Sequence, residues 1–198
     1  MQEKKPTDHH LMHPDRTAQI EGCVLTFFSN VADIELLTDS CPMDHLVTDK
    51  SFTAIINFGG SEQGFVALNC SETLVKLLAT SMMGDEGEIN DTYLSDVLGE
   101  AVNILTDNFL EMTADKKYYK VSIPAVIQSD IDLLQKLLAD RRGYTGSFTH
   151  GASRVLLKVV IRPPDCIATS IVHATQPATV LHEAHQLFSC PRFDKFCT

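Results

Sequence analysis

Apolar residues recur every three or four positions in several stretches of the chain, which is the spacing of amphipathic helices. The clearest stretches are residues 16–32, residues 71–83 and residues 91–111, the longest of them. Residues 129–142 show a weaker pattern of the same kind. The sequence therefore predicts helices in all four stretches.

Other stretches alternate between apolar and polar residues or are rich in β-branched residues, as strands are. Residues 52–58 and 65–69 alternate on either side of a glycine-rich turn, so they should form a hairpin. Residues 118–127 and 153–162 predict longer strands, and residues 145–150 a short one. This order of elements favours an α+β fold, in which an antiparallel sheet packs against long helices in two loosely similar halves.

Composition narrows the class of protein. Lysine and arginine together number 16 and aspartate and glutamate 26, which gives a formal net charge of −10 and argues against nucleic-acid binding. No apolar run approaches the roughly 18 residues of a membrane-spanning helix, so no membrane association is expected. The six cysteines are scattered and form no CxxC pair, which predicts reduced thiols in a cytoplasmic protein.

The pattern also divides the chain. Residues 1–15 are polar and without periodicity, so we expect a flexible leader that contributes nothing to chemistry. Residues 16–164 carry the predicted helices and strands and form the folded domain. Residues 165–198 lose the alternation and are expected to be a C-terminal extension, whose role the sequence does not indicate.

The predicted helix 91–111 has two distinct faces. Its apolar stripe consists of Leu94, Leu98, Ala101, Val102, Leu105 and Phe109. The opposite stripe is expected to project from the exposed side and consists of Asp96, Gly99, Glu100, Asn103 and Asp107. By spacing alone, such a polar stripe is most often a solvated helix surface.

Glu100 and Asn103, within residues 95–105 and followed by Asn108, give this stripe a second interpretation. They resemble the Glu-x-x-Asn helix of the CheC, CheX and FliY chemotaxis phosphatases. The hairpin, the helix that follows it and the strand from residue 118 come in the order that this family uses, so the resemblance covers about residues 16–163. In the first predicted helix, Glu21 is followed by Val24 in place of the amide, which favours the single-site CheX type.

The resemblance implies that the protein removes the phosphoryl group from the aspartyl-phosphate of a CheY-like response regulator in chemotaxis or two-component signalling. Asn103 would orient the attacking water, and Glu100 would dock on the regulator's lysine. Mg²⁺ would be held by the regulator, so no cofactor or metal is expected on this chain. The resemblance also implies a homodimer, and strand 153–162 would otherwise leave a sheet edge exposed.

The main alternative is a noncatalytic CheX-like module that binds a response regulator or a partner subunit. It is supported by Asp107, which stands where the family usually has a glycine, and by the additional segments 129–142 and 165–198. Zinc protease chemistry is disfavoured because His182 and His185 are three residues apart rather than four. The histidines near the N-terminus offer no preformed metal geometry; they are His9, His10 and His13.

Overall fold

The computed structural model describes residues 14–39, 50–60, 62–83, 89–113, 119–128, 134–136, 139 and 143–162. All of them lie in one compact unit of the chain that ends at Pro164. The predicted leader, except for residues 14 and 15, and the predicted extension 165–198 lie outside the described residues. The same holds for the five histidines considered above as metal ligands.

Three helices form where the sequence predicts them, with ends that differ by a few residues. They are α1 (Pro14–Ala32), α2 (Glu72–Met83) and α3 (Asp91–Thr113). Of the fourth predicted helix, only residues 134–136 and 139 are described, and these are helical.

The seven strands of the described chain include four that the sequence predicts closely and three that it does not. The four are β2 (Ser51–Gly59), β3 (Gln63–Ser71), β6 (Tyr144–His150) and β7 (Ser153–Arg162). The short β1 (Leu37–Asp39) was not expected. The single strand predicted at 118–127 is wrong, because two strands form there instead, β4 (Lys120–Val121) and β5 (Ala125–Gln128).

The interruption between β4 and β5 has a local cause. The Ser122 amide donates a hydrogen bond to the Asn57 carbonyl at 2.8 Å, and the Asn57 amide donates one to the Ser122 hydroxyl at 3.0 Å. The hydroxyl therefore replaces a backbone acceptor at this point. Pro124 follows, which has no amide hydrogen to continue a regular ladder.

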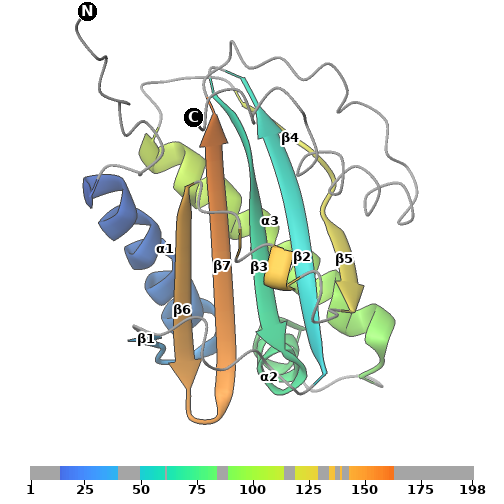
Figure 1. The fold of residues 1–198 in the computed structure, drawn as a ribbon. Helices are drawn as coiled ribbons and strands as arrows, with labels where there is room; N and C mark the ends of the chain where they lie inside the picture. The colour runs from blue at the N-terminus through green and yellow to red at the C-terminus, as the bar shows by residue number, and fades with distance from the viewer. Residues whose placement is uncertain are drawn as a thin grey trace, which may run out of the picture. The chain divides into compact units, whose positions relative to one another are not determined.

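The strands form one antiparallel sheet with the order β1-β6-β7-β3-β2-β4, in which β5 also pairs with β2 (Figure 1). Two halves of similar order can be followed, α1-β1-β2-β3 and α3-β5-β6-β7. The central β3–β7 ladder joins the halves, and the first strand of each half pairs with the hairpin of the other, as β1 with β6 and β5 with β2. The predicted α+β fold with two similar halves is thus confirmed.

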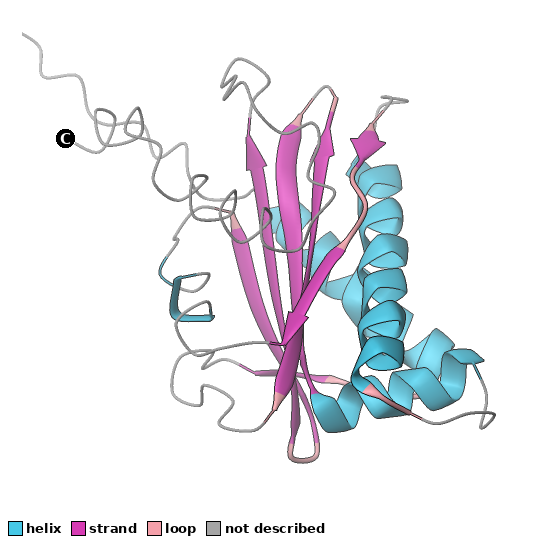
Figure 2. Ribbon diagram, turned by 90° about the vertical axis from the view of Figure 1, so that its right-hand side faces the viewer, coloured by secondary structure: helices cyan, strands magenta, loops and turns pink. Residues whose placement is uncertain are grey.

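The three helices cover one face of the sheet, as the side view shows (Figure 2). The main core lies between these layers, and its largest fully buried members include Phe28, Phe52 and Phe148. Every residue of the predicted apolar stripe on α3 is at most 4% exposed. The sequence pattern therefore identified the core side of the longest helix correctly.

The opposite face of the sheet is also buried, but it contains polar side chains. The Asn69 amide nitrogen lies 3.0 Å from the Thr53 hydroxyl and 3.2 Å from that of Ser51. The Lys158 ammonium donates to the Thr145 hydroxyl at 2.8 Å. These bonds offset the cost of burying polar groups on this face.

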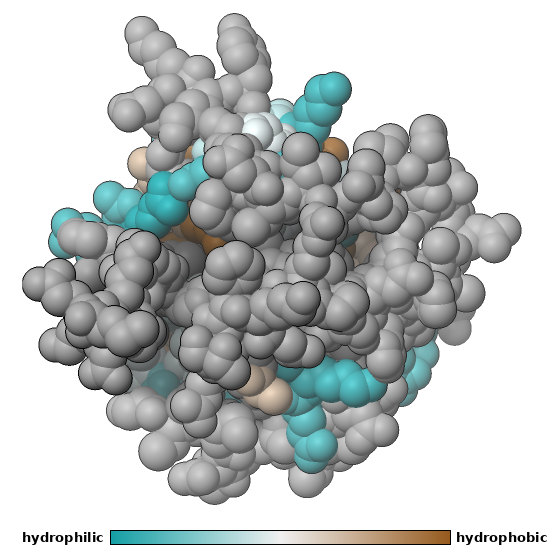
Figure 3. Space-filling model, turned by 45° about the horizontal axis from the view of Figure 1, so that its top comes forward, coloured by the Kyte–Doolittle hydropathy of each residue, from teal (hydrophilic) through white to brown (hydrophobic). Residues whose placement is uncertain are grey.

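On the outer surface, the described atoms visible from above are mostly hydrophilic (Figure 3). No described helix is long and apolar enough to cross a bilayer. Both described cysteines, Cys23 and Cys70, are buried free thiols, and burial raises the pKa of each.

One argument for a homodimer is wrong. Strand β7, at 153–162, is not at an edge of the sheet, because it is hydrogen-bonded to β3 on one side and to β6 on the other. The edges are formed by the short strands β1, β4 and β5, and short edge strands discourage pairing between chains. The homodimer itself stays a prediction.

The β2–β3 turn offers a test of strand packing. A Cβ on Gly64 would overlap the backbone carbonyl oxygen of Val160 and crowd the Phe58 ring, whereas a Cβ on Gly59 would meet nothing within 4 Å. Gly64→Ala should therefore lower the free energy of unfolding by about 2 kcal/mol or more. Gly59→Ala should change it by about 0.5 kcal/mol or less. Equal values in urea denaturation would contradict this packing.

Candidate functional site

Helix α3 begins at a well-defined cap. The Asn90 side-chain oxygen accepts a hydrogen bond from the Tyr93 amide at 3.0 Å, and its carbonyl accepts one from the Leu94 amide at 3.0 Å. Asn90 is thus the N-cap of α3. Asp91, the first residue of the helix, has a different role.

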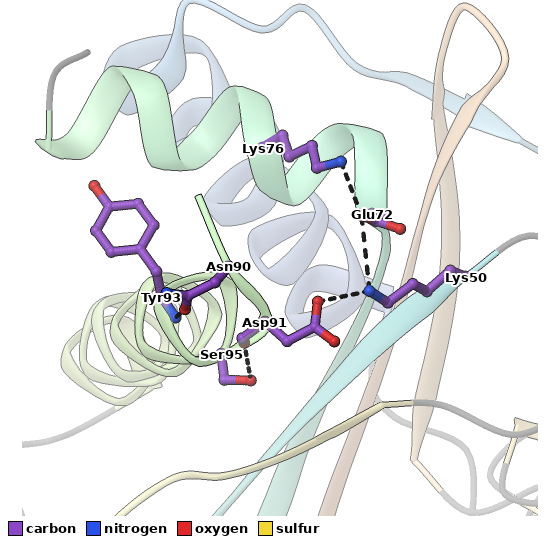
Figure 4. A network of polar contacts seen from close by, with 7 residues as sticks. All are labelled: Lys50, Glu72, Lys76, Asn90, Asp91, Tyr93 and Ser95. Carbon is purple, nitrogen blue, oxygen red and sulfur yellow. Dashed lines mark hydrogen bonds and ion pairs between the residues drawn. The ribbon is translucent and has the colours of Figure 1, made fainter. Parts of the chain in front are cut away.

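Asp91 connects the start of α3 to the sheet and to α2 (Figure 4). The Lys50 ammonium lies 2.6 Å from the Asp91 carboxylate and 3.8 Å from that of Glu72, which in turn lies 2.8 Å from the Lys76 ammonium. The hydrogen bond with Asp91 raises the pKa of Lys50, and the hydrogen bond with Lys76 lowers the pKa of Glu72. Both groups therefore stay charged near neutral pH, and the ends of the two helices are held together.

Along its length, α3 packs against β2 and β5. Gly99 lies at this contact, since a Cβ there would be 3.5 Å from Val126 Cγ2 and 3.8 Å from Pro124 Cβ. Gly99 is buried, so its predicted place on the exposed stripe is wrong. The reason is tertiary: the β4–β5 segment passes beside this flank of the helix (Figure 2).

The other members of the stripe do reach the surface. Asp96, Glu100 and Asp107 are exposed, and Asn103 is partly buried. Because an α-helix advances about 100° and 1.5 Å per residue, Glu100 and Asn103 lie about 60° apart around the axis and about 4.5 Å apart along it. Their side chains can therefore reach one bound group together.

Partial burial of Asn103 follows from its place on the helix. It lies one turn beyond Gly99 and so shares the flank that faces the β4–β5 segment. Within the described residues, the side chains of Glu100 and Asn103 have no hydrogen-bond or ion-pair partner. Both are available to a partner, and the rotamers of Asn103 are restricted on one side.

Sequence reasoning did not find the neighbours of this face. Ser122, Ile123 and Pro124 lie far from Glu100 along the chain, and the β4–β5 interruption brings Pro124 against α3. The one available signal was the proline, which disfavours a central strand position. The pairing with β2 was needed to show where this segment passes.

Helix α1 presents no counterpart of Asn103. Val24 is 1% exposed and belongs to the core, and the carboxylate of Glu21 accepts a hydrogen bond from the Tyr144 hydroxyl at 3.1 Å. Burial raises the pKa of Tyr144, and the charge of Glu21 and this hydrogen bond raise it further. The position that would carry a second amide is therefore packed inside the protein.

A metal centre is not evident in the part of the chain that the structure describes, where no three or more His, Cys, Asp or Glu side chains are grouped to hold an ion. Instead, the side chains of Asp96, Glu100 and Asp107 on α3 are exposed. A group supplied by a partner would approach them from solvent.

Comparison with known proteins supports this view of the fold. The family model of the chemotaxis phosphatase CheX matches residues 52–137, which include all of α3. No curated protein matches the chain.

Several solved structures have the same fold. The chemotaxis protein CheX of Vibrio vulnificus is 12% identical, with a TM-score of 0.56 over 75% of this chain and 97% of its own. CheX of Borrelia burgdorferi, solved in complex with CheY, BeF₃ and Mg²⁺, is 15% identical, with a TM-score of 0.57 over 76% and 99%. A CheC-like protein of Shewanella oneidensis is 17% identical, with a TM-score of 0.56 over 76% and 100%.

The chain therefore shares the α+β fold of these CheX and CheC-like structures. It is also similar in sequence to the CheX family over residues 52–137. The resemblance indicated by the sequence is confirmed.

The absence of an exposed amide on α1 leads to a prediction. Val24→Asn should not create a second site, because the new amide would be buried in the core without a partner. It should lower the free energy of unfolding by about 2 kcal/mol or more. Thr26→Asn, on the exposed side of the same helix, should change it by about 0.5 kcal/mol or less. A fully stable Val24→Asn protein in thermal and urea denaturation would contradict this placement.

Proposed function

We propose that this protein is a phosphatase that removes the phosphoryl group from the aspartyl-phosphate of a CheY-like response regulator. In this proposal Asn103 orients the attacking water, and Glu100 docks on a lysine of the regulator. The observation that carries it is the pairing of an exposed carboxylate and a partly buried amide, three residues apart on an anchored helix.

The chemistry suits an amide. Phosphoryl transfer requires the protein mainly to place an in-line water and to offset charge. The Asn103 side chain can donate and accept hydrogen bonds at once, so it can hold a water in a fixed orientation. Restriction of its rotamers by the flank of α3 reduces the entropy lost when that water is positioned.

Glu100 suits a different task. An ionised carboxylate only accepts hydrogen bonds, and a lysine ammonium is its natural partner. A pair of this kind would fix how far α3 enters the regulator's active site and so bring Asn103 to the phosphoryl group. Exposed Asp96, one turn before Glu100, and exposed Asp107, about two turns after it, extend the negative charge along the same face.

The comparisons support this assignment at the level of the family. The matching family model is that of a chemotaxis phosphatase, and it includes Glu100 and Asn103. The Borrelia relative was solved with CheY as its partner, which supports a CheY-like partner for this chain. Mg²⁺ would then come with the regulator, and the reaction would take place in the cytoplasm, where we still expect a homodimer.

A noncatalytic module that binds the same kind of regulator is the second candidate. Asp107 favours it, because an exposed carboxylate stands where the family usually has a glycine. The two candidates differ in one measurement, the decay of a phosphorylated regulator in the presence of the protein.

Asn103→Ala should abolish most of the activity. Loss of the group that positions the water removes an interaction made mainly in the transition state, so kcat should fall roughly a hundredfold or more. Regulator binding and thermal stability should stay nearly unchanged. The measurement is the decay of a phosphorylated receiver domain at saturating regulator.

Asn108→Ala is the matched control for that variant. Asn108 is an exposed asparagine on the same helix, about 140° away from Asn103 around the axis. Its loss should leave the decay unchanged. If Asn103→Ala behaved like Asn108→Ala, the phosphatase mechanism would be refuted and the binding module favoured.

Glu100→Gln should weaken docking rather than chemistry. The half-saturating concentration of phosphorylated regulator should rise several-fold at low salt, with a smaller difference at high salt, because screening weakens charge attraction. Glu35→Gln, exposed just before β1, makes the same change in net charge away from α3. An equal effect of both variants would point to net charge rather than a specific pair.

A further inference from the structure

The most exposed large apolar side chain in the described part of the protein lies on the β4–β5 segment, whose Pro124 is next to α3 at Gly99. Ile123 is 87% exposed, whereas the next, Leu37, is 71% exposed. Burial of an isoleucine side chain stabilises a protein by about 1.5–3 kcal/mol, and the exposed Ile123 side chain does not provide this stabilisation. A single exposed apolar residue needs no explanation by itself, and the argument depends on its position and on how it is held.

Ile123 is held on both sides. Before it, Ser122 is fixed to β2 by two hydrogen bonds with the Asn57 backbone, of 2.8 and 3.0 Å. After it, Pro124 restricts the preceding residue to extended conformations. Isoleucine is also stiff at χ1 because it is branched at Cβ. The side chain is therefore presented in a nearly fixed direction, and little entropy remains to be lost on binding.

The position of Ile123 is set by its neighbour. Pro124 lies against Gly99, and Gly99 immediately precedes Glu100 and is one turn before Asn103. Ile123 directly precedes Pro124, so its backbone lies next to the flank of α3 at Gly99. The β4–β5 segment can be followed alongside α3 in Figure 2. Asp96, Glu100, Asn103 and Asp107 supply only polar contacts on the face of α3 that carries the carboxylate and the amide.

Stable protein interfaces combine a polar rim with a few apolar anchors that exclude water. We propose that Ile123 is the apolar anchor of the docked response regulator, contacting its surface next to the phosphorylated aspartate while the acidic face of α3 contacts basic groups. This inference rests on the proposed function and adds to it a docking residue outside α3. Exclusion of water around Asn103 by this contact would leave only the positioned water to react.

The test measures the decay of receiver domains phosphorylated with acetyl phosphate, with KM and kcat determined separately. Ile123→Asp should raise KM roughly tenfold and leave kcat at saturation within about twofold, because the residue contacts the partner and not the reacting atoms. Ile123→Val keeps an apolar side chain, so its KM should stay close to that of wild type. Thermal stability should not change, since the side chain is exposed.

Leu37→Asp is the matched control. Leu37 is similarly exposed, but it lies on β1 at the opposite edge of the sheet from β4 and β5. The same substitution there should leave KM unchanged. Equal KM values for Ile123→Asp and wild type, with normal wild-type activity, would overturn the role of Ile123 and leave the proposed function intact.

Two other outcomes have distinct meanings. If wild type accelerates the decay of no receiver domain of its own organism, the proposed function fails, and this inference fails with it. If Ile123→Asp changes the sedimentation of the protein alone but not KM, the side chain contacts a second copy of this chain, which also overturns the inference.

Discussion

The packing of α3 against β2 and β5 is the contact on which the candidate site depends. At the start of the helix this packing is held by the Asn90 cap and the Lys50–Asp91 pair, and in the middle Gly99 is buried beside Pro124 and Val126. One flank of α3 is therefore covered there, whereas Glu100 at the next position stays exposed. Asn103 lies at the boundary between the two, partly held and partly accessible.

The two halves of the fold show how one architecture can carry one site rather than two. Their strands pair in the same crossed way, yet α1 has Val24 in the core and its Glu21 bonded to Tyr144. In the first half, the corresponding face of α1 is therefore packed against the rest of the protein. In the second half, α3 keeps a polar face toward solvent, and Glu100 and Asn103 lie on it.

A site of this kind requires little from its own chain. Phosphoryl transfer depends on position and charge more than on a nucleophile, and a regulator that brings its own phosphoryl group and Mg²⁺ would leave only the water and the docking to be arranged. That would account for a site with two polar residues and no described metal cluster. The partner must also approach in a well-defined orientation. The anchored helix α3 and the β4–β5 segment, which is hydrogen-bonded to β2 through Ser122, can provide this.

The sequence by itself determined the helices, the β2–β3 hairpin, the core side of α3 and the exposure of Glu100, because periodicity records which side of an element avoids water. It could not determine that Gly99 is buried, that β7 is a central strand or that 118–127 is broken in two. These depend on which strands pair and where segments distant in sequence meet. Only the tertiary structure decided that Pro124 lies against α3 at Gly99, directly before Glu100, since local patterning does not specify contacts between remote parts of the chain.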